Sequence, residues 1–387
     1  MIYGDYKVDK NNALPLYLQL EAIIRDGIET GTWKAGDMLP AEEEFCRKYD
    51  IGQITVKRAL RDLTKEGLLS RIKGKGTFVK LNGIPVVSRG QRISLIVPDI
   101  QDIFISEVYQ GIEEIAVAKG YQVATYSSGR LIEKENRNIE ALGENNEKGA
   151  IIFPYWGRFN AGRILELKRK DFPFVLIDRY FPEVQTNTVT VDNIGGASAA
   201  VAHLIELGHR RIGHVGGVSC TSNEDRLEGY RRALGEAGIS YDADMVRRIT
   251  ATDMDGSIRF EPDDIGGYKQ MRELLSMPES PTAVFTGNDY IALGAIKAVR
   301  EAGLKIPDDV AVVGFDDLKF SASLEVPLTT VRQPKYEIGK TAACILMEKI
   351  EGRDAEMRRV VLPTSLVVRE SCGTEAVPRI GLATAMP

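Results

Sequence analysis

Residues 53–79 read QITVKRALRDLTKEGLLSRIKGKGTFV, and they combine a helical pattern with a short glycine-rich hairpin. In the first part, apolar residues recur at helical spacing and predict a helix to about residue 66, with Val56, Ala59, Leu60 and Leu63 on its buried side. In the second part, two short apolar runs flank a Lys-Gly-Lys-Gly tip, which predicts two strands joined by a tight turn. A basic helix followed by a basic hairpin is typical of a DNA-reading helix with a wing beside it.

Two further helices are predicted before this stretch. Helical spacing of apolar residues indicates an amphipathic helix over about 15–30 and a short helix over about 41–49, which buries Phe45 and Tyr49. The three residues 50–52 separate the short helix from the basic one, and such a turn between two short helices is typical of a helix-turn-helix. We therefore predict a winged helix-turn-helix domain over residues 1–80.

The exposed sides of the basic helix and of the wing supply the predicted DNA contacts. Basic side chains neutralise phosphates, and glutamine can bond adenine in bidentate fashion. A basic helix face alone usually lies in solvent, and a Gly-Lys-Gly turn alone is a common hairpin, so the order of the elements is what favours a DNA reader. The residues predicted to contact DNA are Gln53, Thr55, Lys57, Arg58, Lys73, Lys75 and Thr77.

Charge is distributed unevenly along the chain. The net charge of the 387 residues is −5, yet residues 53–80 contain eight basic and two acidic residues, a net charge of +6. Residues 81–387 contain 36 basic and 43 acidic residues, a net charge of −7. A small basic unit is thus attached to a larger acidic body, which suits phosphate binding by one end of the molecule.

Length and composition indicate a soluble globular protein of two or three domains, with 43% hydrophobic and 27% charged residues. No apolar run approaches the roughly 18 residues of a membrane span, so no membrane contact is expected. The first residues lack the basic start and apolar stretch of a secretory signal. Four scattered cysteines without a Cys-x-x-Cys pair indicate reduced thiols, and a cytoplasmic protein is expected.

From residue 91 onward, short apolar runs alternate with helical stretches. Regular alternation of strands and helices predicts parallel sheets with helices on both faces, here in two α/β lobes over 91–373. A linker over 81–90 and a tail over 374–387 flank these lobes. The predicted strands are 93–97, 122–126, 150–153, 174–177, 211–215, 283–286 and 310–315, and the predicted helices include 104–119, 195–207, 226–237, 290–302 and 336–351.

Polar and aromatic residues follow the predicted strands of both lobes. In open α/β sheets, ligands bind beyond the carboxyl ends of the strands. Polyols need paired donors and acceptors together with apolar faces, and both kinds of group occur here. An aspartate after a strand often caps the next helix, so only the convergence of several residues favours a site. The residues at these positions are Asp99, Phe104, Tyr155, Asp178, Arg179, Asn288, Asp289, Asp316 and Asp317.

No catalytic or metal-binding motif is evident in the sequence. His203, His209 and His214 are the only histidines, and their spacing fits no zinc motif. Neither a Gly-x-Gly-x-x-Gly dinucleotide motif nor a Gly-x-Ser-x-Gly nucleophile motif is present. The acid pair Asp316-Asp317 could suggest glycosidase chemistry, but adjacent residues seldom face one substrate together. We therefore expect a binding protein rather than an enzyme, with no cofactor and no metal.

The N-terminal motifs resemble those of the GntR-type winged helix. The matching runs are LPAEEEF at 39–45, GQITVKRAL at 52–60 and GKGTFV at 74–79, and the resemblance covers about residues 14–80. Two positions depart from the family pattern, which has arginine where Glu43 stands and Ser-Arg where Gly52-Gln53 stand. These departures remove typical DNA-contacting groups, so the preferred operator sequence is expected to differ from the family average.

The rest of the chain resembles the sensor domain of the LacI/GalR repressors and their periplasmic sugar-binding relatives. The matching runs include VDNIGG at 191–196, HLIELGHRRI at 203–212, VVGFDD at 312–317, LTTVRQP at 328–334 and LVVRES at 366–371. This resemblance implies that Arg226, Asn288 and Asp316 bond the hydroxyl groups of an effector, and it suggests Asp178 and Phe104 as further contacts. Tyr155 joins them because of its place after a predicted strand.

The same resemblance implies a periplasmic-binding-protein-like fold in which the chain crosses between the lobes three times, near 191, 334 and 358. Lobe 1 would then comprise about 91–190 and 334–357, and lobe 2 about 191–333 and 358–373. The fold class is therefore α/β, with an N-terminal winged helix-turn-helix and a sensor of two parallel-sheet lobes.

A GntR-type reader joined to a LacI-type sensor resembles the arabinose-type repressors of sugar catabolism. This resemblance favours a homodimeric, cytoplasmic transcription repressor that binds double-stranded operator DNA and a small carbohydrate effector, such as arabinose or a related sugar. Two alternatives are a corepressor-type regulator that responds to a purine or another small molecule and a sugar-binding transport component. Stacking aromatic side chains would favour the purine, whereas the basic winged helix counts against transport.

Overall fold

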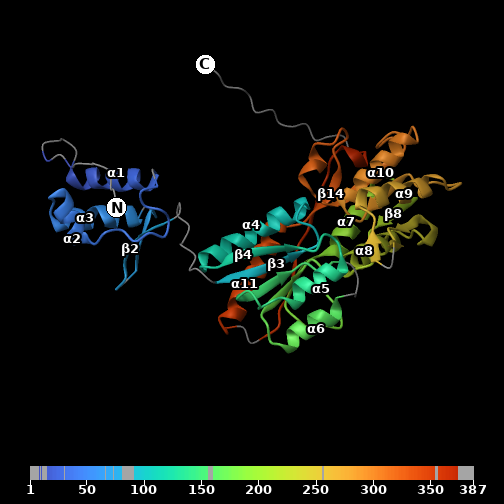
Figure 1. Cartoon of the computed structure of the whole chain (residues 1–387). Helices are drawn as coiled ribbons and strands as arrows, with labels where there is room; N and C mark the ends of the chain where they lie inside the picture. The colour runs from blue at the N-terminus through green and yellow to red at the C-terminus, as the bar shows by residue number, and fades with distance from the viewer. Residues whose placement is uncertain are drawn as a thin grey trace, which may run out of the picture. The chain divides into compact units, whose positions relative to one another are not determined.

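The computed structural model describes residues 8, 10, 15–29, 31–65, 67–72, 74–80, 91–155, 160–254, 257–353 and 356–373 (Figure 1). These residues form two compact units, one up to residue 91 together with 116–122, and the other comprising 92–115 and the residues from 123 onward. The predicted linker 81–90, the predicted tail 374–387 and the predicted contact residue Lys73 lie outside the described residues.

The N-terminal unit contains three helices and a β-hairpin: α1 (Leu16–Glu29), α2 (Glu42–Tyr49), α3 (Gln53–Lys65), β1 (Leu69–Ile72) and β2 (Gly76–Val79). The two strands are antiparallel, with Leu69 opposite Val79 and Ile72 opposite Gly76. One hydrophobic core joins all of these elements, and its buried members include Leu20, Ile24, Trp33, Phe45, Val56, Leu60, Leu63, Leu69 and Val79. The predicted winged helix-turn-helix is thus confirmed.

A tight turn sets the angle between α2 and α3. Asp50 has a φ of 49°, in the left-handed region, and its N–H donates to the Cys46 carbonyl oxygen, which ends α2. Ile51 then buries its side chain in the core beneath the turn. Helix α3 begins at Gln53 after this turn, and the first two side chains of the helix, Gln53 and Ile54, are exposed.

The second unit begins with a six-stranded sheet in the order β15-β7-β6-β5-β3-β4. Its helices α4 and α11 cover one face and α5 and α6 the other (Figure 1). Helices α4 and α11 cross closely because Gly111 lies at the crossing, where a Cβ atom would stand 2.1 Å from the Tyr336 carbonyl oxygen. The elements of this lobe are β3 (Arg92–Val97), α4 (Ile103–Ala118), β4 (Gln122–Ser127), α5 (Ile132–Glu140), β5 (Glu147–Ile152), α6 (Ala161–Arg169), β6 (Phe174–Ile177), β7 (Thr188–Val191), α11 (Lys335–Ile350) and β15 (Arg359–Leu362).

A second six-stranded sheet has the order β16-β14-β13-β12-β8-β9, and only the β14–β16 pair is antiparallel among its described pairs. Helices α7 and α8 pack on one face and α9 and α10 on the other. The elements of this lobe are α7 (Asn193–Glu206), β8 (Ile212–Gly216), α8 (Thr221–Glu236), β9 (Val246–Arg248), α9 (Asp263–Leu275), β12 (Ala283–Thr286), α10 (Asp289–Glu301), β13 (Ala311–Asp316), β14 (Thr329–Arg332) and β16 (Ser365–Val367).

Smaller elements complete the second lobe. Three 3₁₀ turns span Ala243–Met245, Lys319–Ala322 and Glu370–Cys372. A hairpin of β10 (Ala251–Met254) and β11 (Ser257–Phe260) stands apart from both large sheets. This hairpin is absent from the predicted elements, and α8 begins five residues earlier than the predicted helix over 226–237.

The chain crosses between the lobes at three places. The crossings follow β7, β14 and β15, which end at Val191, Arg332 and Leu362. The third prediction is wrong, because β15 pairs in parallel with β7 and therefore belongs to the first sheet. The crossing follows Leu362 rather than residue 358, because β15 forms the edge strand of the first sheet before the chain enters the second lobe.

Candidate functional site

The first candidate site is the exposed face of α3. Gln53 is its first residue and is exposed, Thr55 is half-buried, and Lys57 and Arg58 are exposed one turn later. Arg61 extends the basic face by another turn. The first turn of the second helix in such a motif is the part that enters the major groove of DNA, so these side chains occupy the reading position.

Local contacts orient the basic side chains of this face. The Arg58 guanidinium carbon lies 3.7 Å from the centroid of the Tyr17 ring, and its Nε lies 3.7 Å from the Asp62 carboxylate. Glu42, the first residue of α2, lies 3.0 Å from Arg71 of the hairpin and 3.9 Å from Lys57 of α3. Glu42 therefore links the reading helix to the hairpin beside it.

The hairpin places its basic tip in solvent. Lys75 is exposed in the turn between β1 and β2, and Thr77 is half-buried on β2 opposite Arg71. Gly74 and Gly76 have φ values of 79° and 130°, which side-chain-bearing residues rarely adopt, so the tight tip needs both glycines. The arrangement is that of a wing, although Lys73 lies outside the described residues.

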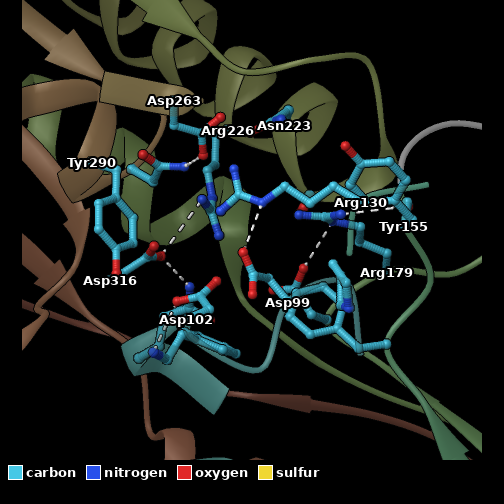
Figure 2. A pocket seen from close by; sticks show the side chains of 17 residues that line it. Asp99, Asp102, Arg130, Tyr155, Arg179, Asn223, Arg226, Asp263, Tyr290 and Asp316 are labelled. Carbon is cyan, nitrogen blue, oxygen red and sulfur yellow. Dashed lines mark hydrogen bonds and ion pairs between the residues drawn. The ribbon is translucent and has the colours of Figure 1, made fainter. Parts of the chain in front are cut away.

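The second candidate site is a cleft between the two lobes, where the carboxyl ends of both sheets meet (Figure 2). The cleft is partly open to solvent, and its cavity volume is about 60 Å³. All six predicted effector contacts line it: Phe104, Tyr155, Asp178, Arg226, Asn288 and Asp316. The structure thus brings together residues that lie more than 200 positions apart in the sequence.

Arg226 of α8 and Asp316 of β13 form the buried floor of the cleft. The Arg226 guanidinium donates to Asn193 Oδ1 at 2.8 Å and to the Gly287 carbonyl oxygen at 2.6 Å, and it lies 3.7 Å from Asp316 Oδ1. The guanidinium carbon of Arg226 lies 3.9 Å from the centroid of the Phe315 ring, against which it packs. Burial raises the pKa of the Asp316 carboxyl to about 8, against the opposing charge of Arg226.

Asn288 connects the cleft to α9 and α10. Its Oδ1 accepts a hydrogen bond from the Ile291 N–H and so caps α10, while its Nδ2 donates to Asp263 Oδ2 at 2.8 Å. Asp263, the first residue of α9, is thereby held at the wall of the cleft. Burial raises the pKa of the Asp263 carboxyl above its ordinary range.

The first lobe contributes a charged pair and two phenylalanines. Asp178 follows β6 with a φ of 62°, and its carboxylate lies 3.2 Å from Arg179 Nε. The Arg179 guanidinium stands 4.8 Å above the Phe153 ring, and Phe104 tilts against Phe153 with 5.9 Å between ring centroids. This side of the cleft therefore offers hydrogen-bonding groups next to apolar ring surfaces.

Tyr155 is fixed from both sides of its backbone. Its N–H donates to both oxygens of the buried Glu135 carboxylate, at 3.0 and 2.9 Å. Arg179 donates to the carbonyl oxygens of Pro154 and Tyr155 at 3.3 and 3.4 Å. The Tyr155 ring then packs against Cys220 of the second lobe, so this residue also connects the two lobes.

The β14–α11 crossing reaches the floor of the cleft. Gln333 Nε2 donates to Asp316 Oδ1 at 2.6 Å, while the buried Gln333 Oε1 has no hydrogen-bond partner in the described part of the chain. Lys335 is buried at the start of α11 and donates to the Asp316 and Asp317 carbonyl oxygens at 2.6 and 3.2 Å. A molecule that contacts Asp316 therefore lies beside a segment that joins the lobes.

The two adjacent acids that could have suggested catalysis diverge. Asp317 turns from the cleft and pairs with Arg332 and Arg369, each at 2.6 Å. Asp289 is buried beneath the cleft, where it accepts hydrogen bonds from Leu318, Ser321 and Thr330. Of Asp316 and Asp317, at the end of β13, Asp316 lines the cleft and Asp317 does not.

The cleft is also lined by residues outside the six predicted effector contacts: Asp99, Asp102, Arg130, Phe153, Arg179, Asn223, Asp263, Tyr290 and Gln333. Asp99 and Arg179 were already named as strand-end residues, and Arg130 and Phe153 also stand at or just beyond strand ends, where the same rule could have found them. Asp263 and Asn223 stand at or near the beginning of helices instead. Gln333 belongs to the LTTVRQP run at 328–334, and its place beside the crossing predicted near 334 could have indicated that it lies between the lobes.

Charges in the cleft are balanced in pairs. Arg130, Arg179 and Arg226 lie 3.4, 3.2 and 3.7 Å from the carboxylates of Asp99, Asp178 and Asp316 respectively. The lining also holds Asp102 and Asp263, so it contains more carboxylates than guanidinium groups. Burial raises the pKa of Asp102 to about 6. Such a site can exchange many hydrogen bonds with a ligand.

A winged helix-turn-helix joined to a two-lobed unit with a polar interlobe cleft defines a DNA-binding transcription regulator with a ligand-sensing domain. Residues 16–79 match the family model of bacterial regulatory proteins, gntR family, and residues 201–372 match that of the periplasmic binding protein-like domain. The arabinose metabolism transcriptional repressor of Geobacillus stearothermophilus is 33% identical over 368 residues, which cover 94% of this chain and 99% of that protein. The chain belongs to this family of bacterial transcriptional repressors.

Solved structures of regulators have the same architecture. The transcriptional regulator CelR in complex with cellobiose is 30% identical, with a TM-score of 0.66 over 82% of this chain and 90% of that one. A LacI family transcriptional regulator from Enterococcus faecium with bound ribose is 28% identical, with a TM-score of 0.59 over 72% and 98% of the two chains. Among the described residues of the present chain, every helix is too short or too polar to cross a membrane.

Proposed function

We propose that this protein represses transcription from a sugar-responsive operator and that an uncharged sugar in the interlobe cleft controls its affinity for DNA. The single observation that carries this proposal is the cleft itself, in which all six predicted effector-binding residues line one cavity. Arabinose or a related pentose is the first candidate, since the relatives include an arabinose metabolism repressor and a ribose-bound regulator.

The charge balance of the cleft supports an uncharged ligand. Each of its three arginines lies beside the carboxyl group of an aspartate, although the raised pKa of about 8 leaves Asp316 mostly protonated at pH 7, and Asp102 and Asp263 add further acidic groups. A phosphate or carboxylate on the sugar would lie among Asp99, Asp178 and the other acidic groups of the lining, and repulsion between like charges disfavours it. Neutral hydroxyl groups can instead donate to the carboxylates and accept from the guanidinium groups.

Control of DNA binding would act through the lobe crossings. The effector would contact Asp316, whose side chain and backbone are bonded by Gln333 and Lys335 of the β14–α11 crossing. A ligand that favours one angle between the lobes would alter the spacing of two DNA readers in a homodimer on a pseudo-palindromic operator. Typical coupling free energies of this kind are about 1–3 kcal/mol.

The cleft would bind its ligand without converting it, and the protein would work in the cytoplasm, where operator DNA and an imported sugar meet. The divergence of Asp316 and Asp317 counts against this adjacent pair as the two carboxyl groups that glycosidase chemistry places around one bond. A product assay with each sugar that binds checks this point, and turnover would contradict it.

The test is operator binding by the full chain with and without candidate ligands. A thermal-shift screen of pentoses, hexoses, their phosphates and purines first identifies molecules that stabilise the protein. Each stabilising molecule is then added to an operator-binding titration. We expect an uncharged sugar to stabilise the chain and to change its operator affinity at least fivefold. A purine alone acting in both assays would overturn the sugar proposal, and no active small molecule would overturn sensing altogether.

A further inference from the structure

The reading face of α3 contains one side chain that phosphate binding does not explain. Ile54, the second residue of α3, has 85% of its surface exposed, more than any other large apolar side chain in the described ranges. Single exposed apolar residues are common on protein surfaces, so exposure alone identifies no partner. Its surroundings are what identify one.

Ile54 lies among groups suited to nucleic acid. Gln53 precedes it, and the exposed cations Lys57, Arg58 and Arg61 follow within two turns of the same helix. These charges attract a polyanion and make an apolar protein surface a poor partner for this face. Ile54 also occupies the first turn of the second helix of the motif, which is the part that contacts base edges.

The base edges of the major groove offer one prominent apolar group, the C5 methyl of thymine. We propose that Ile54 recognises thymine by packing against this methyl group, next to the base pair read by Gln53. Glutamine pairs well with adenine through N6 and N7, so the two side chains together would favour consecutive A·T pairs. This inference rests on the proposed function, because it assumes that α3 reads an operator.

The proposal can be tested by removing only the methyl group. A random-sequence duplex library is selected with the full-length chain to give its preferred operator, and each thymine of that operator is replaced in turn by deoxyuridine. Base pairing is unchanged by this replacement. At one position in each half-site, we expect about a fourfold loss of affinity per replacement, the worth of one buried methyl group.

The same duplexes are then titrated with Ile54→Ala. Because a homodimer carries the substitution in both readers, this variant should lose about 16-fold in affinity for the thymine duplex, as the wild type does when the methyl group is removed from both half-sites, and it should be insensitive to deoxyuridine at that position. Folding should be retained, because the Ile54 side chain is exposed and alanine is the better helix former. Equal thermal unfolding of the variant and the wild type checks this expectation.

Two further variants isolate the effect. Ile265→Ala removes an isoleucine that is 46% exposed on α9, in the other compact unit, and should leave operator affinity and the methyl effect unchanged. Gln53→Ala should weaken discrimination at the neighbouring adenine but keep the deoxyuridine effect. If no thymine responds to methyl removal, or if Ile54→Ala retains the full response, the proposal is overturned. Selection of no preferred sequence at all would instead overturn sequence-specific operator binding itself.

Discussion

The two candidate sites use charge in opposite ways. On the reading unit, Lys57 and Arg71 have side chains that are 52% and 67% exposed, and both share the carboxylate of Glu42. In the cleft, the side chains of Arg226 and Asp316 are only 6% and 12% exposed, and each has several fixed partners. Exposed pairs can exchange a carboxylate for a phosphate at little cost, whereas buried pairs hold one geometry and select ligands by fit.

The largest effect is expected in the cleft, at Arg226. Arg226→Lys keeps the positive charge but cannot donate to Asn193, to Gly287 and toward Asp316 with one planar group. We expect sugar affinity to fall about 100-fold, or roughly 2–3 kcal/mol, as hydrogen bonds to a charged group are lost. Operator affinity without sugar should stay within about twofold.

Calorimetric titration of the sugar and an operator-binding titration measure these two quantities. Arg231→Lys is the matched control, because Arg231 lies on the same helix but contacts the Tyr241 ring outside the cleft. It should change neither affinity. Sugar affinity that stays within threefold of the wild type in Arg226→Lys would remove Arg226 from the site.

The next effect concerns pH and the buried acid. The folded pKa of Asp316 is about 8, compared with an ordinary value of 3.8, so the folded chain retains a proton that the unfolded chain has released. The free energy of unfolding should therefore fall as pH rises from 7 to 8, by about 1 kcal/mol. The pKa of His214 is lowered to about 4, which affects stability only below about 6.5.

Asp316→Asn should remove this pH dependence, because the amide does not titrate. Chemical denaturation of the wild type and the variant at pH 7, 7.5 and 8 gives the comparison. Glu135, whose pKa burial raises to about 7, remains in both proteins and so cancels in the difference. Identical pH profiles would show that the Asp316 carboxyl is already ionised at pH 7.

A smaller effect is expected at the exposed tip of the wing. Lys75→Ala should reduce operator affinity severalfold and lower the slope of log affinity against log salt by about 0.9 per reader, if Lys75 contacts one phosphate. Sugar binding in the cleft should hardly depend on salt. Lys305→Ala, which removes an exposed lysine of the second lobe, serves as the control. An unchanged salt slope in Lys75→Ala would place the wing tip away from the phosphates.

The smallest effect, and the one whose sign is most informative, concerns Glu42. Glu42→Gln removes a negative charge from the reading unit and releases Lys57 and Arg71. Stability should change by less than about 0.5 kcal/mol, as for other exposed ion pairs. Operator affinity should rise about two- to threefold. A fall in affinity would mean that Glu42 holds the two cations in place for DNA rather than competing with it.

The reading unit could be predicted almost entirely from the sequence because its signals are local. The turn at residues 50–52, the buried stripe of α3 and the glycines of the wing each lie within a few residues of the structure they determine. Ile54 was the exception. Its position two residues before Val56 already lies off the buried stripe of α3, but no role was assigned to it, and the structure shows that its side chain is exposed.

The cleft could be predicted only in part, because its residues converge from distant segments. Phe104, Tyr155, Asp178, Asn288 and Asp316 stand at or beyond strand ends, where topology alone brings them together, and Arg226 came from the family resemblance. The place of Asp263 in the cleft depends on its hydrogen bond from the Asn288 amide. The place of Gln333 depends on the path of the β14–α11 crossing, which brings it to Asp316. The course of β15 also escaped prediction, since its pairing with β7 joins residues 171 positions apart.

The central claim is that the cleft and the reading unit are coupled, and thermodynamic linkage gives the most direct test. The affinity of the full chain for its sugar is measured calorimetrically with and without saturating operator DNA. The account predicts that the two sugar affinities differ by the same factor, at least fivefold, by which the sugar changes operator affinity. Equal sugar affinities in the presence and absence of operator would contradict it.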